Sequence, residues 1–170
     1  MERSINELDA DLFSGEADGS ADPKDIRRKA MDYLARREYG QVELITKLVQ
    51  AGFDEDASVA VVEQLHAEGL QDDRRFIESF VQSRVSQGKG PVRIQLELDA
   101  RGVGTEIISD VLEGTDTDWA ALATEIRVKK FGAAAPSDFS EKARQMRFLQ
   151  FRGFETEHIQ AAMESDSGSR

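Results

Sequence analysis

A six-residue pattern recurs three times along this chain of 170 residues. The first copy is LVQAGF at 48–53, and it returns as LDARGV at 98–103 and as LQFRGF at 149–154. In each copy a helix-like run ends at a glycine, an apolar residue follows, and another helix-like run begins. Self-similarity at an interval of about 50 residues is typical of stacked helical units, which offer a long surface to a partner and rarely form a catalytic pocket.

The apolar residues between these markers follow helical spacing, and no stretch alternates convincingly with period two. We therefore predict an all-α fold of three tandem three-helix repeats, forming an elongated, curved array of undetermined handedness. The predicted repeats cover residues 26–70, 71–115 and 116–164. Residues 1–25 and 165–170 contain few apolar groups to offset ordering entropy, so we predict a disordered acidic N-terminal tail and a disordered C-terminal tail.

Glycines and capping residues mark the predicted helix ends. Three glycines are expected to follow the second helix of each repeat in a left-handed conformation: Gly52, Gly102 and Gly153. Five positions are candidates for helix N-caps: Asp54, Asp72 or Asp73, Asp118 and Thr156. Pro91 suits the first turn of a helix, because its missing N–H would have no partner there.

The charge is distributed unevenly. The net charge is −11, but residues 1–25 alone carry eight acids and two bases. The remaining residues hold 20 bases among 25 acids, and most of these bases occur in clusters. Such clusters are either solvated helix faces or, because they recur near corresponding points of the repeats, parts of a shared basic face.

The motifs of catalysis and cofactor binding are missing from the sequence. GKG at 88–90 lacks the spacing and hydroxyl of a phosphate-binding loop, and His66 and His158 are isolated from each other and from any nucleophile motif. We therefore expect no enzyme, no cofactor, no metal and no small-molecule substrate. No apolar run approaches the roughly 20 residues that cross a bilayer, and there is no secretory signal or cysteine, so we expect no membrane association and a cytoplasmic location.

Several segments between the predicted tails match the sequence pattern of a known family: AMDYLARRE at 30–38, EGLQDDRRF at 68–76, GKGPVRI at 88–94 leading to RGV at 101–103, KAR at 142–144 and RFLQFRGF at 147–154. Through these segments, residues 26 to about 164 resemble the RecX family of bacterial recombination regulators. Each segment alone is a weak signal, but together, in this order and spacing, they are specific.

The resemblance implies an all-helical, three-unit, curved module without an active site. It implies binding to the RecA recombinase along the groove of its DNA filament, with inhibition of ATP hydrolysis and strand exchange, in DNA repair and the SOS response. Because the chain is acidic overall, we expect protein contacts to dominate, DNA to bind weakly at most, and the chain to be a monomer. The alternative is a direct DNA-binding regulator with helix-turn-helix-like units, which would bind DNA without the recombinase.

Eight basic residues are the candidates for contact with the partner. Four lie in or near the start of the second repeat: Arg74, Arg75, Lys89 and Arg93. Four lie in the third repeat: Lys129, Lys130, Arg144 and Arg147. For Arg74 and Arg75 an alternative remains open, in which they pair with Asp72, Asp73 and Glu78 on a solvated helix.

Overall fold

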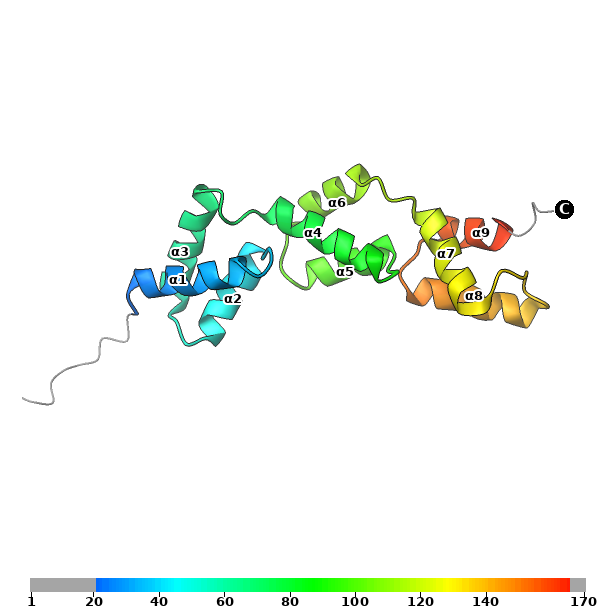
Figure 1. Ribbon diagram of the computed structural model, residues 1–170, viewed down its shortest axis with the longest axis horizontal. Coiled ribbons are helices and arrows are strands. Elements are labelled where there is room, and N and C mark those ends of the chain that lie inside the picture. Colours follow the sequence, from blue (N-terminus) through cyan, green and yellow to red (C-terminus); the bar gives the residue numbers. More distant parts are fainter. Residues whose placement is uncertain (1–20, 166–170) are drawn as a thin grey trace, which may run out of the picture.

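The structure is a computed structural model, which describes residues 21–165 (Figure 1). Within this range the chain forms nine α-helices and no strand. The first unit contains α1 (Pro23–Leu34), α2 (Gln41–Gln50) and α3 (Glu55–Ala67). The second contains α4 (Asp73–Ser86), α5 (Pro91–Asp99) and α6 (Thr105–Gly114), and the third contains α7 (Trp119–Phe131), α8 (Phe139–Phe151) and α9 (Thr156–Glu164). The predicted all-α fold with three tandem three-helix units is confirmed.

Each unit has its own hydrophobic core. The first core is centred on Leu44, Leu48 and Leu65, and the second includes Phe76 and Ile94. The third core is built from α7, α8 and α9 and includes Leu149, Phe154 and Met163. Trp119 packs against both the second and the third core, so it joins the two units at the start of α7. Three small cores in series, in place of one large core, account for the elongated form.

The three units follow one another along the long axis of the molecule (Figure 1). Within each unit of this view the third helix lies highest and the second helix lies lowest. The second helices α2, α5 and α8 therefore share one long side of the array. We call this side the second-helix edge.

The repeated glycines end the second helices as predicted. Their φ angles are +97° at Gly52, +73° at Gly102 and +90° at Gly153. In the first unit the amide of Phe53 donates to the carbonyl of Leu48, and the equivalent bond recurs in the other two units. This bond pattern is the Schellman motif, which needs a left-handed residue and therefore favours glycine.

The predicted caps are mostly confirmed. Asp54, Asp72 and Asp118 cap α3, α4 and α7, each through a carboxylate that accepts a backbone N–H of the first turn. Asp72, and not Asp73, is therefore the cap of α4. The prediction for Thr156 is wrong, because α9 begins at this residue and Glu155 occupies the N-cap position.

The N-terminal boundary differs from the predicted one. Helix α1 begins at Pro23 and is capped by Asp22, so residues 23–25 are helical, although the sequence analysis assigned them to the tail. An aspartate followed by a proline is a helix start signal, and here it extends the first unit beyond the apolar stripe. The rest of the predicted tails, residues 1–20 and 166–170, lies outside the described residues.

Candidate functional site

The contacts between the first and second units involve the start of α4. The Arg75 guanidinium donates to the Glu38 carboxylate at 3.2 Å and to the Gly69 carbonyl at 3.0 and 3.1 Å. The Asp73 carboxylate accepts the amide of Gln41 at 2.9 Å. Both acceptors of Arg75 precede α4 in the chain, so Arg75 ties the second unit to the first.

Arg74 lies beside Arg75 but has a different partner. Its guanidinium forms an ion pair with Asp110 on α6, and the hydrogen bond that it donates to that carboxylate raises the pKa of Arg74 above its usual value. The pairing of these two arginines with Asp72, Asp73 and Glu78, kept open from the sequence, is therefore not the arrangement found. The side chains of Arg74 and Arg75 bond residues of other helices and loops, and not their neighbours on α4.

The second and third units meet through their backbones. The Gly90 amide donates to the Arg152 carbonyl at 2.9 Å, and the Val92 amide donates to the Gly153 carbonyl at 3.0 Å. A Cβ atom on Gly153 would lie 2.3 Å from the Cβ of Arg93. The turn after α8 therefore docks on the first turn of α5, and glycine is needed there for space as well as for its φ angle.

An equivalent contact joins the first and second units, but there the glycine turn faces a side chain and not a backbone. A Cβ atom on Gly102, in the turn after α5, would lie 2.9 Å from Cγ1 of Val42 in the first turn of α2. Gly52 has no preceding unit in the described chain, and a Cβ atom there would meet nothing within 4 Å. The docking rule is thus that the turn after one second helix contacts the start of the preceding second helix.

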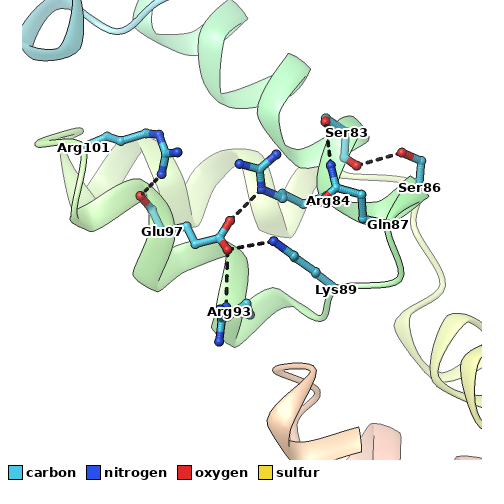
Figure 2. Close-up of polar contacts among 8 residues, drawn as sticks. All are labelled: Ser83, Arg84, Ser86, Gln87, Lys89, Arg93, Glu97 and Arg101. Carbon is cyan, nitrogen blue, oxygen red and sulfur yellow. Dashed lines mark hydrogen bonds and ion pairs between the residues drawn. The ribbon is translucent and has the colours of Figure 1, made fainter.

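Three basic side chains converge on Glu97 of α5 (Figure 2). Its carboxylate accepts Arg84 at 2.6 Å, Lys89 at 2.9 Å and Arg93 at 3.3 Å. Burial alone would raise the pKa of Glu97, but the hydrogen bonds from the three bases outweigh it and lower the pKa to about 2. Glu97 therefore stays ionised at neutral pH, and its hydrogen bonds hold Lys89 and Arg93 in place beside the unit junction.

A groove between α5 and α8 brings four of the eight candidate bases together. It has a volume of about 660 Å³ and is lined by seven residues: Lys89, Arg93, Arg144, Arg147, Phe148, Phe151 and Arg152. We call it the α5–α8 groove. No acidic residue lines it, and the Phe151 side chain at its wall is 83% exposed. The groove therefore combines an aromatic surface with five cations.

The other four candidate bases lie elsewhere. Lys129 and Lys130, at the end of α7, line a neighbouring hollow of about 480 Å³ that also contacts Phe148 and Arg152. Arg74 lines a third hollow together with acidic residues of α4, α6 and the α6–α7 link, and Arg75 belongs to the first unit junction. Four of the five cations of the groove were thus among the candidates from the sequence, whereas Arg152 and the aromatic wall were not.

Phe151 could have been found from its phase in the helix. Leu149 is the fully buried residue at this end of α8, and Phe151 follows it by two positions, which places it off the apolar stripe. A large aromatic residue off the stripe is exposed unless another element covers it. This signal, combined with the neighbouring arginines, would have marked the groove.

The two histidines have structural roles in the described part of the chain. His66 Nδ1 lies 3.0 Å from the side-chain oxygen of Gln71, and His158 Nδ1 accepts the Glu155 amide at 3.3 Å in a capping box. Potential ligand atoms of Glu155, Glu157 and His158 lie within 4.8 Å of one another. Helix capping accounts for the positions of Glu155 and His158. Among residues 21–165, no helix is both long and apolar enough to cross a bilayer.

Three family models match the chain in order. They describe the first, second and third three-helix domains of RecX, and they match residues 27–65, 72–112 and 116–163. Regulatory protein RecX of Halorhodospira halophila is 47% identical over 137 residues, which cover 81% of this chain and 85% of that protein. Regulatory protein RecX of Pseudomonas entomophila is 42% identical, with 81% and 88% covered.

A solved structure shows the same fold at lower sequence similarity. The crystal structure of RecX from Lactobacillus salivarius aligns with a TM-score of 0.72 and 20% identity, and the alignment covers 85% of this chain and 96% of that one. The order of the three matched domains, the identity to curated relatives and the shared architecture agree, and the chain belongs to the RecX family of regulatory proteins.

Proposed function

We propose that the protein binds the RecA recombinase on its DNA filament and inhibits RecA's ATP hydrolysis and strand exchange. Membership of the RecX family, with all three units present in order, is the observation that carries this proposal. The elongated array supports it, because a row of similar units can follow a row of filament subunits. The protein then acts by occupying a surface and needs no chemistry of its own.

The second-helix edge and its groove are the surface that best suits this role. The chain as a whole carries a charge of −11, yet five cations line the α5–α8 groove. Local positive charge on an acidic protein favours contact with acidic patches of a partner and disfavours general adhesion to DNA. We therefore expect a cytoplasmic monomer that binds DNA only weakly by itself.

The test compares three targets with the full chain: RecA alone, DNA alone and RecA assembled on DNA. Binding is expected to be strongest to the assembled filament, and ATP hydrolysis and strand exchange by that filament should fall as the protein is added. Failure to slow either reaction at concentrations that saturate binding would refute the proposal.

The second candidate function is direct regulation through DNA. The five cations of the groove are the observation that favours it. It predicts tight binding to DNA without RecA and a steep fall of the binding constant with salt, because each neutralised phosphate releases counterions. A shallow salt dependence with weak DNA affinity would eliminate it.

A further inference from the structure

Exposed apolar side chains are concentrated on the second-helix edge. Six of the eight large apolar residues that are exposed among the described residues lie on second helices: Val42, Val49, Val92, Leu96, Phe139 and Phe151. The two others, Met31 and Leu70, lie on α1 and in the α3–α4 link. Exposed apolar residues concentrated on the helices of one long side of the array indicate a surface that a partner covers.

The kind of partner follows from the shape of these side chains. Those on α2 and α5 are aliphatic, with Leu96 61% exposed, and aliphatic groups offer no flat face on which nucleic acid bases can stack. A protein surface can cover both aliphatic and aromatic side chains along the edge. The composition of the edge therefore favours a protein partner over single-stranded nucleic acid.

The α5–α8 groove adds a charge requirement to this apolar surface. Its bases are partly balanced within the chain, since Glu97 bonds Lys89 and Arg93 and Glu141 pairs with Arg144 at 3.2 Å. Arg147 is exposed and forms no hydrogen bond or ion pair within residues 21–165. Five cations against two nearby carboxylates leave an excess of positive charge around the Phe151 ring.

The groove is held in shape by the unit junction. Arg152 donates from Nη1 to the Gln87 carbonyl at 3.2 Å, and its own carbonyl accepts the Gly90 amide. Both walls are thereby fixed to each other before a ligand arrives. A preformed groove loses less conformational freedom on binding, which favours recognition of a short segment.

We propose that the α5–α8 groove binds an acidic polypeptide segment of the partner, with an aromatic or large aliphatic side chain against Phe151 and flanking carboxylates on Arg147 and Arg93. The inference rests on the proposed function in one respect, because it assigns this segment to the RecA filament. Guanidinium groups suit carboxylates because they can donate two parallel hydrogen bonds. The apolar side chain supplies contact area, while the carboxylates set orientation and selectivity.

The direct test measures binding of labelled peptides to the full chain by fluorescence anisotropy. One peptide has a central phenylalanine flanked by aspartates and glutamates, a second replaces that phenylalanine with serine, and a third replaces the acids with their amides. The first peptide should bind about tenfold more tightly than either of the others. Equal binding of the three peptides, or no binding of the first, would overturn the inference.

Variants on α8 locate the site. Phe151→Ser and Arg147→Glu should each weaken binding of the acidic phenylalanine peptide about tenfold. The matched controls are Phe139→Ser and Lys142→Glu, because both residues are exposed on the same helix and neither lines the groove. Circular dichroism melting shows that each variant is folded. Equal losses of peptide affinity in the control and groove variants would overturn the assignment. It would also be overturned if an oligothymidylate bound the parent, the peptide did not, and Phe151→Ser and Arg147→Glu weakened binding of the oligothymidylate.

A strand-exchange assay with RecA separates this inference from the proposed function. If the parent inhibits RecA but does not bind the acidic peptide, the inference fails and the proposed function stands. If the parent binds the peptide in the expected way but does not inhibit RecA, the proposed function fails and the groove remains an acidic-segment site. Support for both requires that Phe151→Ser weakens inhibition while Met31→Ser, a change at an exposed residue of α1 that lies off the second-helix edge, does not.

Discussion

Replacement of the repeated glycines by alanine tests the docking rule between units. Gly52, Gly102 and Gly153 share a positive φ angle but differ in what a Cβ atom would meet. At Gly52 nothing lies within 4 Å, so Gly52→Ala should cost only the left-handed backbone energy, about 1–2 kcal/mol. At Gly102 the obstacle is the Val42 side chain, whose Cγ1 and Cβ would lie 2.9 and 3.2 Å away, so we expect about 1 kcal/mol in addition, at the low end of the cost of overpacking because no backbone atom is involved.

Gly153→Ala should be the most destabilising of the three substitutions. The new Cβ would lie 2.3 Å from Cβ and 2.5 Å from the backbone nitrogen of Arg93, and backbone atoms of a packed helix cannot move aside independently. Relief requires the third unit to shift, which breaks the bonds from Gly90 and Val92, each with a net contribution of about 1 kcal/mol. The sum of strain and lost bonds is roughly 3 kcal/mol or more.

Two measurements check this ranking. Urea unfolding followed by circular dichroism gives the loss in unfolding free energy for each variant. Amide hydrogen exchange reports on the junction itself, where Gly90 and Val92 should lose protection in Gly153→Ala but keep it in Gly52→Ala. If Gly52→Ala and Gly153→Ala are equally destabilising, the glycines are required for their φ angle alone and the docking rule is wrong.

Three further predictions concern polar contacts and the N-terminal boundary. Arg75→Ala should lower the unfolding free energy by about 1 kcal/mol in a thermal melt, because its bonds join two units but its side chain is 45% exposed; an unchanged melt would contradict this. The pKa of Glu97 in the folded state is about 2, below its usual 4.5, so the ion pairs of Glu97 contribute to the free energy of unfolding above pH 4.5. This contribution, about 3 kcal/mol, should be lost as the pH falls toward 2. Urea unfolding at a series of pH values should show that Glu97→Gln removes this part of the pH dependence. Deletion of residues 1–20 should leave the melting temperature unchanged, whereas deletion of residues 1–25 removes the Asp22 cap and should cost about 1 kcal/mol.

Most of the fold follows from local signals in the sequence. The three glycine turns have the expected conformation, and Asp54, Asp72 and Asp118 cap the helices expected to follow them. These features depend on residues within one helical turn, where periodicity, caps and glycine are informative. Thr156 shows the limit of such signals, because threonine is a preferred cap and glutamate is not, yet Glu155 occupies the N-cap position in a capping box with His158.

The candidate site depended on contacts that local signals do not reveal. Arg75 is 37 positions from Glu38, and no spacing rule selects one such pair among many acids. Arg127 appears in the sequence as part of a basic cluster with Lys129 and Lys130, yet it is fully buried and bonds the Gln145 side chain at 3.3 Å. Whether a base lies in the core, at a junction or in a groove is set by how the units stack, which requires the three-dimensional arrangement.

The α5–α8 groove and the second unit junction are built from the same few residues. Phe151 and Arg152 end α8, and the next residue, Gly153, is the one that docks on α5. Arg93 lines the groove with its side chain while its backbone packs against Gly153. A ligand in the groove therefore contacts both units at the point where they are joined. Binding there should strengthen the junction, since any rotation of the third unit against the second would separate the two walls that hold the ligand.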